Sequence, residues 1–570
     1  MSPRIMPALR AVVLCAIGLG AAPARSRGSG DLDHRLALSF QRLSQPDYDI
    51  GSVLADKIEP SWPGDVQGRL VLAWTALAQA TGREPPQLKA LVAGLPATFN
   101  RDGYLGPLLD LNAINEQQLS GHGWLISGLC HYADYSGDRR PLAWVDQMIH
   151  NLALPLRGAY RRYPRTPDDR NRNGGTVGRL TGRTVNGWRV STDVGCAYIF
   201  LEGLVSSYRE RPSPELASLI DEVAEAFLST DVVAIQAQTH AALCGARNLL
   251  LYDKAAGFRH GWLPRLEAFY TLYRTRAMTE NEANWNWFGR PSWTEPCAIV
   301  DSFLLAMELW RATAHASYLD DAHRIFYNGL GYGQKTDGGF GSDAFSREGG
   351  LAIANRHWDI PWCCNMRGAC GLAGAAAARE EWRAGPGVLI LPFYSDGAIR
   401  AGGYDLSEET DWPLEAVVTI RGRREPGAPP TLHQLNFFIP SACPPSAVRL
   451  QLDDHAIPAE VRNSFAAVSL PPGVRNFTVR LAMALPVRIE RPHNPATRAD
   501  LVTVRYGYLL LGTPDGQTLS SLRLEDLKPL GAGRFKVDKG GLVLVPLCEM
   551  PFSEATPAAP WRTQVLFNPD

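Results

Sequence analysis

Two neighbouring thiols carry the clearest chemical signal in the sequence. Cys363 and Cys364 are adjacent, follow Pro361-Trp362 and precede an Ala-rich helical pattern. Asn365 is expected to cap that helix at its N-terminus. A thiol at a helix N-terminus meets the positive end of the helix dipole, which lowers the thiol pKa and favours the thiolate. The pair is therefore predicted to be reactive or metal-bound sulfur.

A carboxylate and a third thiol lie about 65 residues upstream. Glu295 and Cys297 are two residues apart at the start of another predicted helix, so both side chains could face one point. Zn²⁺ accepts four ligands of these kinds in a tetrahedral arrangement. Spacing alone leaves alternatives open, because adjacent cysteines are often core residues or halves of separate disulfides.

Several short motifs resemble glycoside hydrolase family 127, the β-L-arabinofuranosidase family. They are the run Trp293 to Ala298, the Cys363-Cys364-Asn365 run before a small-residue helix, the strand Arg505 to Leu509, and Ile439-Pro440-Ser441. The resemblance covers most of the chain from about residue 60, in the same order. It implies an (α/α)6 barrel followed by β-sandwich domains, and hence a glycoside hydrolase.

The resemblance also implies a mechanism. Zinc is held by Glu295, Cys297, Cys363 and Cys364, and Cys363 is the catalytic nucleophile. The Cys363 thiolate attacks the anomeric carbon in place of the carboxylate that most retaining glycosidases use. Water then resolves the glycosyl-thioether with help from a general acid/base, so the configuration is retained. The predicted substrate is an oligosaccharide or glycan with a terminal furanosidic sugar.

The acid/base is expected upstream of Glu295, where the loop Asn281 to Trp293 is shorter than in the family. Glu282 is the first candidate and Glu280 the second; the alternative for each is a solvated loop carboxylate. The segment holds three tryptophans, Trp285, Trp287 and Trp293. Trp287 is expected to stack on the sugar, and ordinary core packing is the alternative for two of the three.

Two histidines resemble residues that line the sugar pocket in the family. They are His122, which opens a helix, and His240 in Thr239-His240-Ala241. A core histidine with satisfied hydrogen bonds is the competing interpretation. A third family histidine has no match, and the nearest position is Asp193, which we assign to substrate binding.

Two other functions remain open at this point. The same helical domain could hold a structural zinc while Glu282 and Asp301 carry out inverting hydrolysis. Alternatively, the chain could bind carbohydrate without turning it over.

The composition excludes some partners. A formal net charge of -1 in 570 residues gives no reason to expect nucleic acid. Arg4 and Arg10, the apolar run Ala11 to Ala22 and the small residues after it predict a signal peptide, so the protein is expected to be exported, either periplasmic or secreted. No later segment is apolar enough for a membrane span. A homodimer is left open.

The elements that must position these residues fall into two parts. Helical periodicity dominates from about residue 66 to 383, and the predicted helices imply antiparallel pairs that close into a barrel. These helices are expected over residues 70–80, 121–135, 195–208, 216–228, 240–252, 298–313, 320–328 and 366–382. After Gly385-Pro386-Gly387, short apolar runs separated by turn residues predict strands of one or two sandwiches. The expected fold is thus a multidomain α + β chain, with an (α/α)6 helical toroid followed by β-sandwich domains. The expected boundaries are 1–28 for the signal peptide, 29–386 for the catalytic barrel and 387–570 for the β-sandwich region.

The segment from Tyr163 to Thr192 is polar and rich in Arg and Gly. In a compact domain such a long segment indicates either a functional rim loop or a mobile insertion.

Overall fold

The computed structural model describes residues 32–170, 176–345, 352–494, 500–538, 540–552 and 562–569. The predicted signal peptide, residues 1–28, lies outside the described residues.

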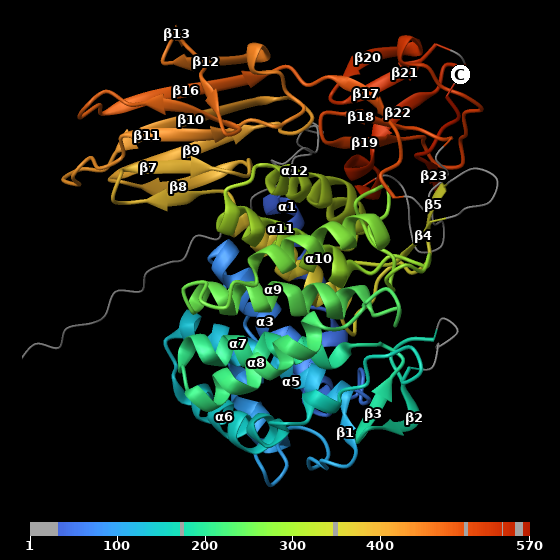
Figure 1. Ribbon diagram of the computed structural model, residues 1–570. Helices are drawn as coiled ribbons and strands as arrows, with labels where there is room; N and C mark the ends of the chain where they lie inside the picture. Colours follow the sequence, from blue (N-terminus) through green and yellow to red (C-terminus); the bar gives the residue numbers. More distant parts are fainter. Residues whose placement is uncertain are drawn as a thin grey trace, which may run out of the picture.

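The N-terminal two thirds of the described chain is mainly helical (Figure 1). The longer helices are α1 (Leu32–Arg42), α3 (Asp65–Thr81), α5 (Glu116–Ser136), α6 (Arg140–Met148), α7 (Leu201–Glu210), α8 (Pro214–Leu228), α9 (Thr239–Ala255), α10 (Leu263–Arg276), α11 (Pro296–Thr313), α12 (Ser317–Arg324) and α14 (Cys364–Ala377). Short helices are α2 (Ile50–Leu54), α4 (Leu88–Gly94) and α13 (Gly331–Gly333). Within the described residues, no helix is both long and apolar enough to cross a membrane.

Helices α3 and α5 cross closely because glycines line their contact. A Cβ on Gly68 would lie 2.2 Å from the backbone nitrogen of Leu125, and one on Gly121 would lie 2.2 Å from the carbonyl oxygen of Pro63. Side chains of any size are therefore excluded at these two positions. The close crossing holds the N-terminal turn of α3 against the centre of the helical part, where the candidate site lies.

Strands dominate from residue 381 onward. A six-stranded sheet has the order β13-β12-β16-β10-β9-β8, and a five-stranded sheet has the order β14-β15-β11-β7-β6. Their bounds are β6 (Glu381–Arg383), β7 (Val388–Leu391), β8 (Gly397–Ala401), β9 (Tyr404–Thr410), β10 (Val417–Arg424), β11 (Gln434–Phe438), β12 (Val448–Leu452), β13 (His455–Ile457), β14 (Val461–Arg462), β15 (Phe465–Ser469) and β16 (Asn476–Met483). Burial alternates along β9 and β10, as expected for strands with one face against a core.

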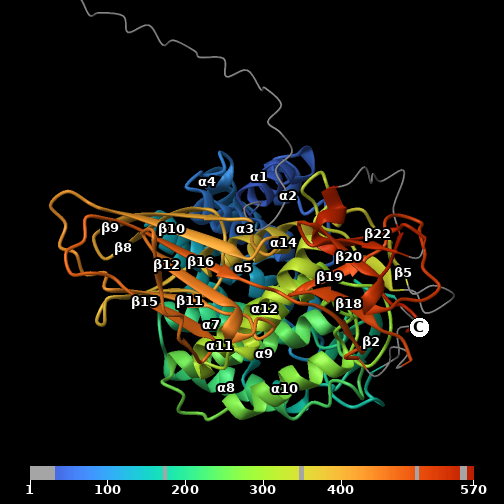
Figure 2. The ribbon, with the colours of Figure 1, turned by 90° about the horizontal axis from the view of Figure 1, so that it is seen from above.

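A third large sheet follows, with the order β17-β18-β19-β22-β21-β20. Its strands are β17 (Val487–Glu490), β18 (Thr503–Tyr506), β19 (Leu509–Gly512), β20 (Leu527–Gly531), β21 (Arg534–Val537) and β22 (Val543–Pro546). Figure 2, seen from above, shows both strand-rich parts over one end of the helical part. The last strand, β23 (Arg562–Gln564), pairs with β5 (Ala352–Asn355), which also pairs with β4 (Asp343–Phe345). The C-terminal segment is therefore tied to a loop of the helical part.

The mixture of a helical part and several sheets confirms the coarse fold prediction, whereas closure into six helix pairs, the sandwich geometry and the domain boundaries stay predictions. Three local expectations were wrong. The helix expected over 366–382 ends at Ala377, and β6 follows it. The expected loop 163–192 contains the hairpin of β2 (Leu180–Val185) and β3 (Trp188–Ser191), with β1 (Ile114–Asn115) pairing alongside. Helices α1, α6 and α10 were missed.

Candidate active site

The four predicted metal ligands come from the N-termini of two helices. Glu295 is the residue before α11. Pro296 suits the first helical position, because proline has no N–H and an N–H at that position has no acceptor within the helix. Cys363 precedes α14, and Cys364 is its first residue. The expected cap at Asn365 was wrong. Its side chain instead accepts a hydrogen bond from Phe340 and donates one to Asp359, which fixes the loop beneath the helix start.

The three sulfur atoms form one cluster. Cys363 Sγ lies 3.4 Å from Cys364 Sγ, and Cys297 Sγ lies 3.7 Å from Cys364 Sγ, so all three thiols are free. Tetrahedral zinc with Zn–S bonds of about 2.3 Å would place sulfur ligands about 3.8 Å apart. Glu295 is partly buried, and its buried Oε2 has no hydrogen-bond partner among the described residues. The kinds of ligand therefore fit a zinc ion. The three thiols lie close enough together to hold a metal ion, and Glu295 lies within such reach of Cys297.

The electrostatics of the cluster are uneven. Burial opposes ionisation of Cys297, yet hydrogen bonds from Cys363 and Cys364 hold the Cys297 pKa well below its usual value. The pKa of Cys363 is raised well above its usual value by that same bond to Cys297, and burial raises the pKa of Cys364. Burial likewise raises the pKa of Glu295. A negative charge in the cluster is therefore favoured on Cys297 over Cys363 and Cys364.

A cation from α3 faces this charge. Arg69 Nη1 lies 3.8 Å from Cys297 Sγ, and its Nη2 lies 3.4 Å from His240 Nε2. Asp65, one turn earlier, accepts a hydrogen bond of 2.6 Å from Arg69 Nε. The guanidinium also lies 4.3 Å from the ring centroid of Trp124. Arg69 is thus held between a carboxylate, an indole and the thiolate.

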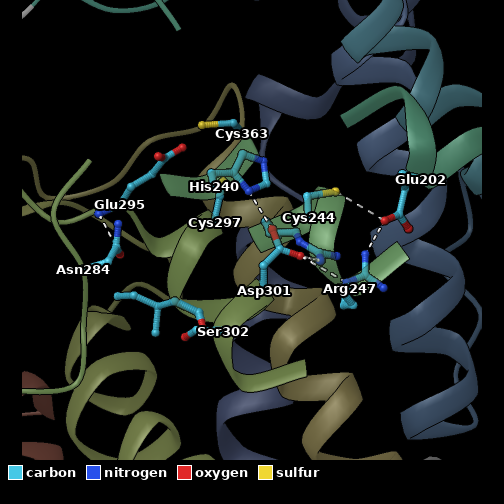
Figure 3. Close-up of polar contacts among 12 residues, drawn as sticks. Glu202, His240, Cys244, Arg247, Asn284, Glu295, Cys297, Asp301, Ser302 and Cys363 are labelled. Atoms are coloured by element: carbon cyan, nitrogen blue, oxygen red, sulfur yellow. Dashed lines mark hydrogen bonds and ion pairs between the residues drawn. The ribbon is translucent and has the colours of Figure 1, made fainter. Parts of the chain in front are cut away.

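His240 connects the cluster to a buried ionic network (Figure 3). Its Nδ1 lies 2.6 Å from Asp301 Oδ2. Asp301 is fully buried and also pairs with Arg367 and, at 3.4 Å, with Arg247. Burial works against ionisation of Asp301, but Arg367 and His240 hold its pKa below the usual value. His240 Nε2, Glu295 and Cys297 lie close enough to share a metal ion, so His240 offers a second metal-binding group beside the cysteines.

A pocket of about 190 Å³ opens beside the cluster. Cys363 and Cys364 line it, as do Arg69, His240, Glu295 and the side chains around them. Several lining side chains have buried polar atoms without a hydrogen-bond partner among the described residues: Asp65, Asp193, Gln238, Asn286, Glu295 and Ser342. Because buried polar groups are normally paired, this concentration indicates a polar ligand.

The residues predicted to bind substrate are divided by the structure. His240 and Asp193 line the pocket, as expected from the sequence. Trp287 is buried behind it, with its ring centroid 4.9 Å from that of Trp293, which does line the pocket. Trp293 is therefore the stacking candidate, and Trp287 supports it from behind.

His122 is placed differently from the expectation. It is fully buried on α5, its Nε2 accepts a hydrogen bond from the Leu105 backbone at 3.1 Å, and its Nδ1 donates to the Gln118 carbonyl at 2.7 Å. Both ring nitrogens are used, and burial lowers its pKa to about 4. His122 is not among the described residues that line the pocket, so its position matches the core alternative.

The two acid/base candidates also lie elsewhere. Glu282 accepts hydrogen bonds from Arg505 at 2.6 Å and from Asn328 at 2.9 Å. Glu280 lies 2.9 Å from the ring of His493 and accepts a hydrogen bond from the Asn494 backbone. Both line a small separate cavity beside β17 and β18. The structure therefore brings neither of them to the cysteines. It also keeps Glu282 apart from Asp301, because Glu282 is held by Arg505 on β18, whereas Asp301 is held by buried arginines of the helical part.

Several pocket residues were missed in the sequence. Asp65 and Arg69 are spaced as an ion pair on one helix face, but the predicted helix began only at Leu70. Trp362 was noted only as a neighbour of the cysteines, although 42% of it is exposed at the pocket. Arg356, which lies 3.7 Å from the ring centroid of Trp293, gave no signal in the sequence.

The chain has the fold of solved glycoside hydrolase structures. One of them, described as a glycoside hydrolase, is 14% identical with a TM-score of 0.65, covering 94% of this chain and 95% of the other. A GH127 β-L-arabinofuranosidase from Geobacillus stearothermophilus T6 is 14% identical with a TM-score of 0.64, covering 95% and 98%. A second GH127 β-arabinofuranosidase is 13% identical with a TM-score of 0.65, covering 95% and 96%. A scan of protein-family models and a search of curated proteins found no match. The resemblance to family 127 is thus confirmed as a match of fold.

Proposed function

We propose that this protein is an exported, retaining glycoside hydrolase that releases a terminal furanosidic sugar from a glycan, with Cys363 as the nucleophile. The observation that carries the proposal is the exposure of the three thiols. Cys363 is only partly buried and lines the pocket, whereas Cys297 and Cys364 are buried. The fold shared with GH127 enzymes supports the same function.

Glu295, Cys297, Cys363 and Cys364 would hold a zinc ion in this proposal. When bound, zinc supplies positive charge that keeps the thiols deprotonated at neutral pH, which their own environment does not achieve for Cys363. In an oxidising compartment the bound ion also protects the thiols from disulfide formation. A disulfide between Cys363 and Cys364 in native protein would contradict this protection.

The chain's own residues then divide the work. Cys363 Sγ forms a bond to the anomeric carbon as the glycosidic bond breaks, and water later displaces the sulfur from the opposite face, so two inversions retain the configuration. The unpartnered polar atoms of Gln238, Asn286 and Ser342 are available to sugar hydroxyls. Trp293 offers an apolar face to the ring.

Substitution of two cysteines on the same helix tests the proposal. Wild type, Cys363→Ala and Cys370→Ala are compared on aryl α- and β-L-arabinofuranosides and related aryl glycosides, with the product anomer identified by NMR before mutarotation. Cys370 is also buried on α14 but does not line the pocket. We expect retained configuration, a loss of at least about 10³-fold in kcat for Cys363→Ala, and little change for Cys370→Ala.

The other outcomes point to the other functions. Full activity in Cys363→Ala with inverted product would establish a carboxylate mechanism with structural zinc. Glycan binding by wild type without turnover of any glycoside would establish a binding protein.

A further inference from the structure

We propose that Asp193 is the catalytic acid/base of this site, giving a proton to the leaving oxygen in the first step and taking one from water in the second. This inference rests on the proposed function, because one group that acts as acid in the first step and as base in the second belongs to a displacement by Cys363. It assigns Asp193 a reacting role instead of sugar binding.

The remaining carboxylates that line the pocket have other roles. Asp65 is paired with Arg69 at 2.6 Å; burial raises the pKa of Asp65, and the guanidinium opposes this by favouring the charged form. Glu295 belongs to the metal-binding set. Glu59 lies at the pocket with only partial burial, and its carboxylate accepts a hydrogen bond of 2.7 Å from Ser61. Glu59 belongs neither to an ion pair with Arg69 nor to the metal-binding set, so the test below includes it as a competitor for proton transfer.

The carboxyl group of Asp193 is held but not neutralised. Its Oδ2 accepts a hydrogen bond of 3.1 Å from the Gly178 backbone, whereas Oδ1 has no partner among the described residues. The backbone of Asp193 is fixed too, since its N–H donates to Ser191 Oγ at 3.1 Å and its carbonyl accepts from Cys196 at 3.0 Å. A rigidly placed carboxyl with one free oxygen suits transfer of a proton to a bound sugar.

The surroundings favour the protonated form of Asp193. Only 5% of the residue is exposed, and burial, opposed by the bond from Gly178, raises its pKa to about 7. Nearby carboxylates add to the effect, namely Glu116, Asp65 and Glu59, of which Glu116 is paired with Arg170 and Asp65 with Arg69. Both protonation states are therefore accessible at neutral pH, as acid/base catalysis in two directions requires.

The proton inventory closes over the two steps. In the first, Sγ of Cys363 bonds to the anomeric carbon, the carbon–oxygen bond breaks, and the leaving oxygen takes the proton of Asp193. In the second, the Asp193 carboxylate takes a proton from water as the water oxygen bonds to the anomeric carbon, and the electron pair of the carbon–sulfur bond returns to sulfur. The sum is hydrolysis, and both side chains end as they began.

The test uses Asp193→Asn in the full chain and the matched variant Glu59→Gln, with the aryl arabinofuranosides that wild type hydrolyses. Asn has the shape of Asp but cannot donate the carboxylic proton. We expect kcat/KM of Asp193→Asn to fall about 10³-fold or more on a phenyl glycoside. On the 2,4-dinitrophenyl glycoside kcat/KM should fall far less, because this leaving group needs no proton. Added azide, which needs no base, should speed the second step and give a glycosyl azide of retained configuration. Zinc content and the thermal midpoint should match wild type.

Three results would overturn the inference. The first is that Asp193→Asn loses equal activity on both glycosides and forms no glycosyl azide. The second is that Glu59→Gln, and not Asp193→Asn, loses far more activity on the phenyl glycoside than on the 2,4-dinitrophenyl glycoside. The third is that the wild-type pH profile of kcat/KM shows no acidic group that must be protonated. The last measurement needs no variant, so it holds even where Asp193→Asn does not fold. A failure of the proposed function is distinct, because wild type would then release no sugar, or Cys363→Ala would keep full activity with inverted product.

Discussion

The Nδ1 atom of His240 lies 2.6 Å from Oδ2 of Asp301, and this bond fixes the state of the imidazole. Nε2 faces the guanidinium of Arg69 at 3.4 Å. Because a guanidinium can only donate, Nε2 must be the accepting nitrogen and Nδ1 the one that carries the proton. Asp301 therefore keeps a lone pair of His240 pointed at the cluster of Glu295 and Cys297.

Asp301→Asn should destabilise the protein strongly. The substitution leaves Arg367 and Arg247 buried with less negative charge, and the loss of one partner of a buried pair typically costs about 3–5 kcal/mol. Urea unfolding of wild type and variant measures the cost. Asp321→Asn is the matched control, because burial raises the pKa of Asp321 to about 6 and a neutral side chain suits that site. Equal losses in the two variants would contradict this account of the network.

Protein purified without added metal should contain about one zinc per chain. Cys364→Ala should contain little, since it removes the sulfur that lies within 3.7 Å of both other thiols. Cys370→Ala, on the same helix, should match wild type. Elemental analysis of the three proteins decides the matter, and no zinc in wild type would remove the activated-thiolate mechanism.

The affinity for zinc should rise with pH. In the metal-free site the pKa values of Cys363 and Cys364 are raised, so these thiols hold protons at neutral pH that a metal must displace, and the raised pKa of Glu295 acts in the same direction. Each proton displaced lowers the apparent affinity about tenfold for every pH unit of acidification. Competition with a chromophoric chelator between about pH 6.5 and 8.5, at constant ionic strength, gives the slope. An affinity independent of pH would show that the ligands are already deprotonated.

The candidate metal ligands could be predicted from the sequence because their signal is local. Two short motifs lie at the starts of helices, Glu295 with Cys297 and Cys363 with Cys364. The start of a helix can be predicted from local sequence, and it places neighbouring side chains close together. Asp193 was also found, but only as the position where a family histidine is missing. Its carboxylate is held by the Gly178 backbone, just before the hairpin of β2 and β3, in a segment that was expected to be a loop.

The predicted site residues that lie away from the pocket are held there by contacts between distant segments. Glu282 is held by Arg505, which lies 223 residues further along the chain, and no local sequence pattern predicts that pair. His122 has both nitrogens bonded to backbone groups, which an amphipathic pattern cannot distinguish from an open histidine. Arg69 reaches the thiols because Gly68 lets α3 and α5 cross closely, and that crossing is a property of the packed structure.

Acidification should loosen the contact between α12 and the strands around it through His323. This imidazole is fully buried, with Nε2 donating to the Pro392 carbonyl at 2.9 Å and Nδ1 accepting from Trp412 Nε1 at 3.4 Å. Burial lowers its pKa to about 4. The unfolded chain therefore binds a proton near pH 6.5 while the folded chain does not, so stability falls as pH drops from about 6.5 toward 4.

At pH 5 this histidine alone should cost about 2 kcal/mol of unfolding free energy relative to pH 7. In His323→Gln, whose amide can still donate to Pro392 and accept from Trp412, the loss between the two pH values should shrink by that amount. His455→Gln is the control, since His455 is exposed and should leave the difference unchanged. Urea unfolding of wild type and both variants, each at pH 5 and pH 7, measures the required free energies of unfolding. An unchanged pH dependence in His323→Gln would mean that the folded chain takes up the proton as readily as the unfolded chain, against the hydrogen bonds seen here.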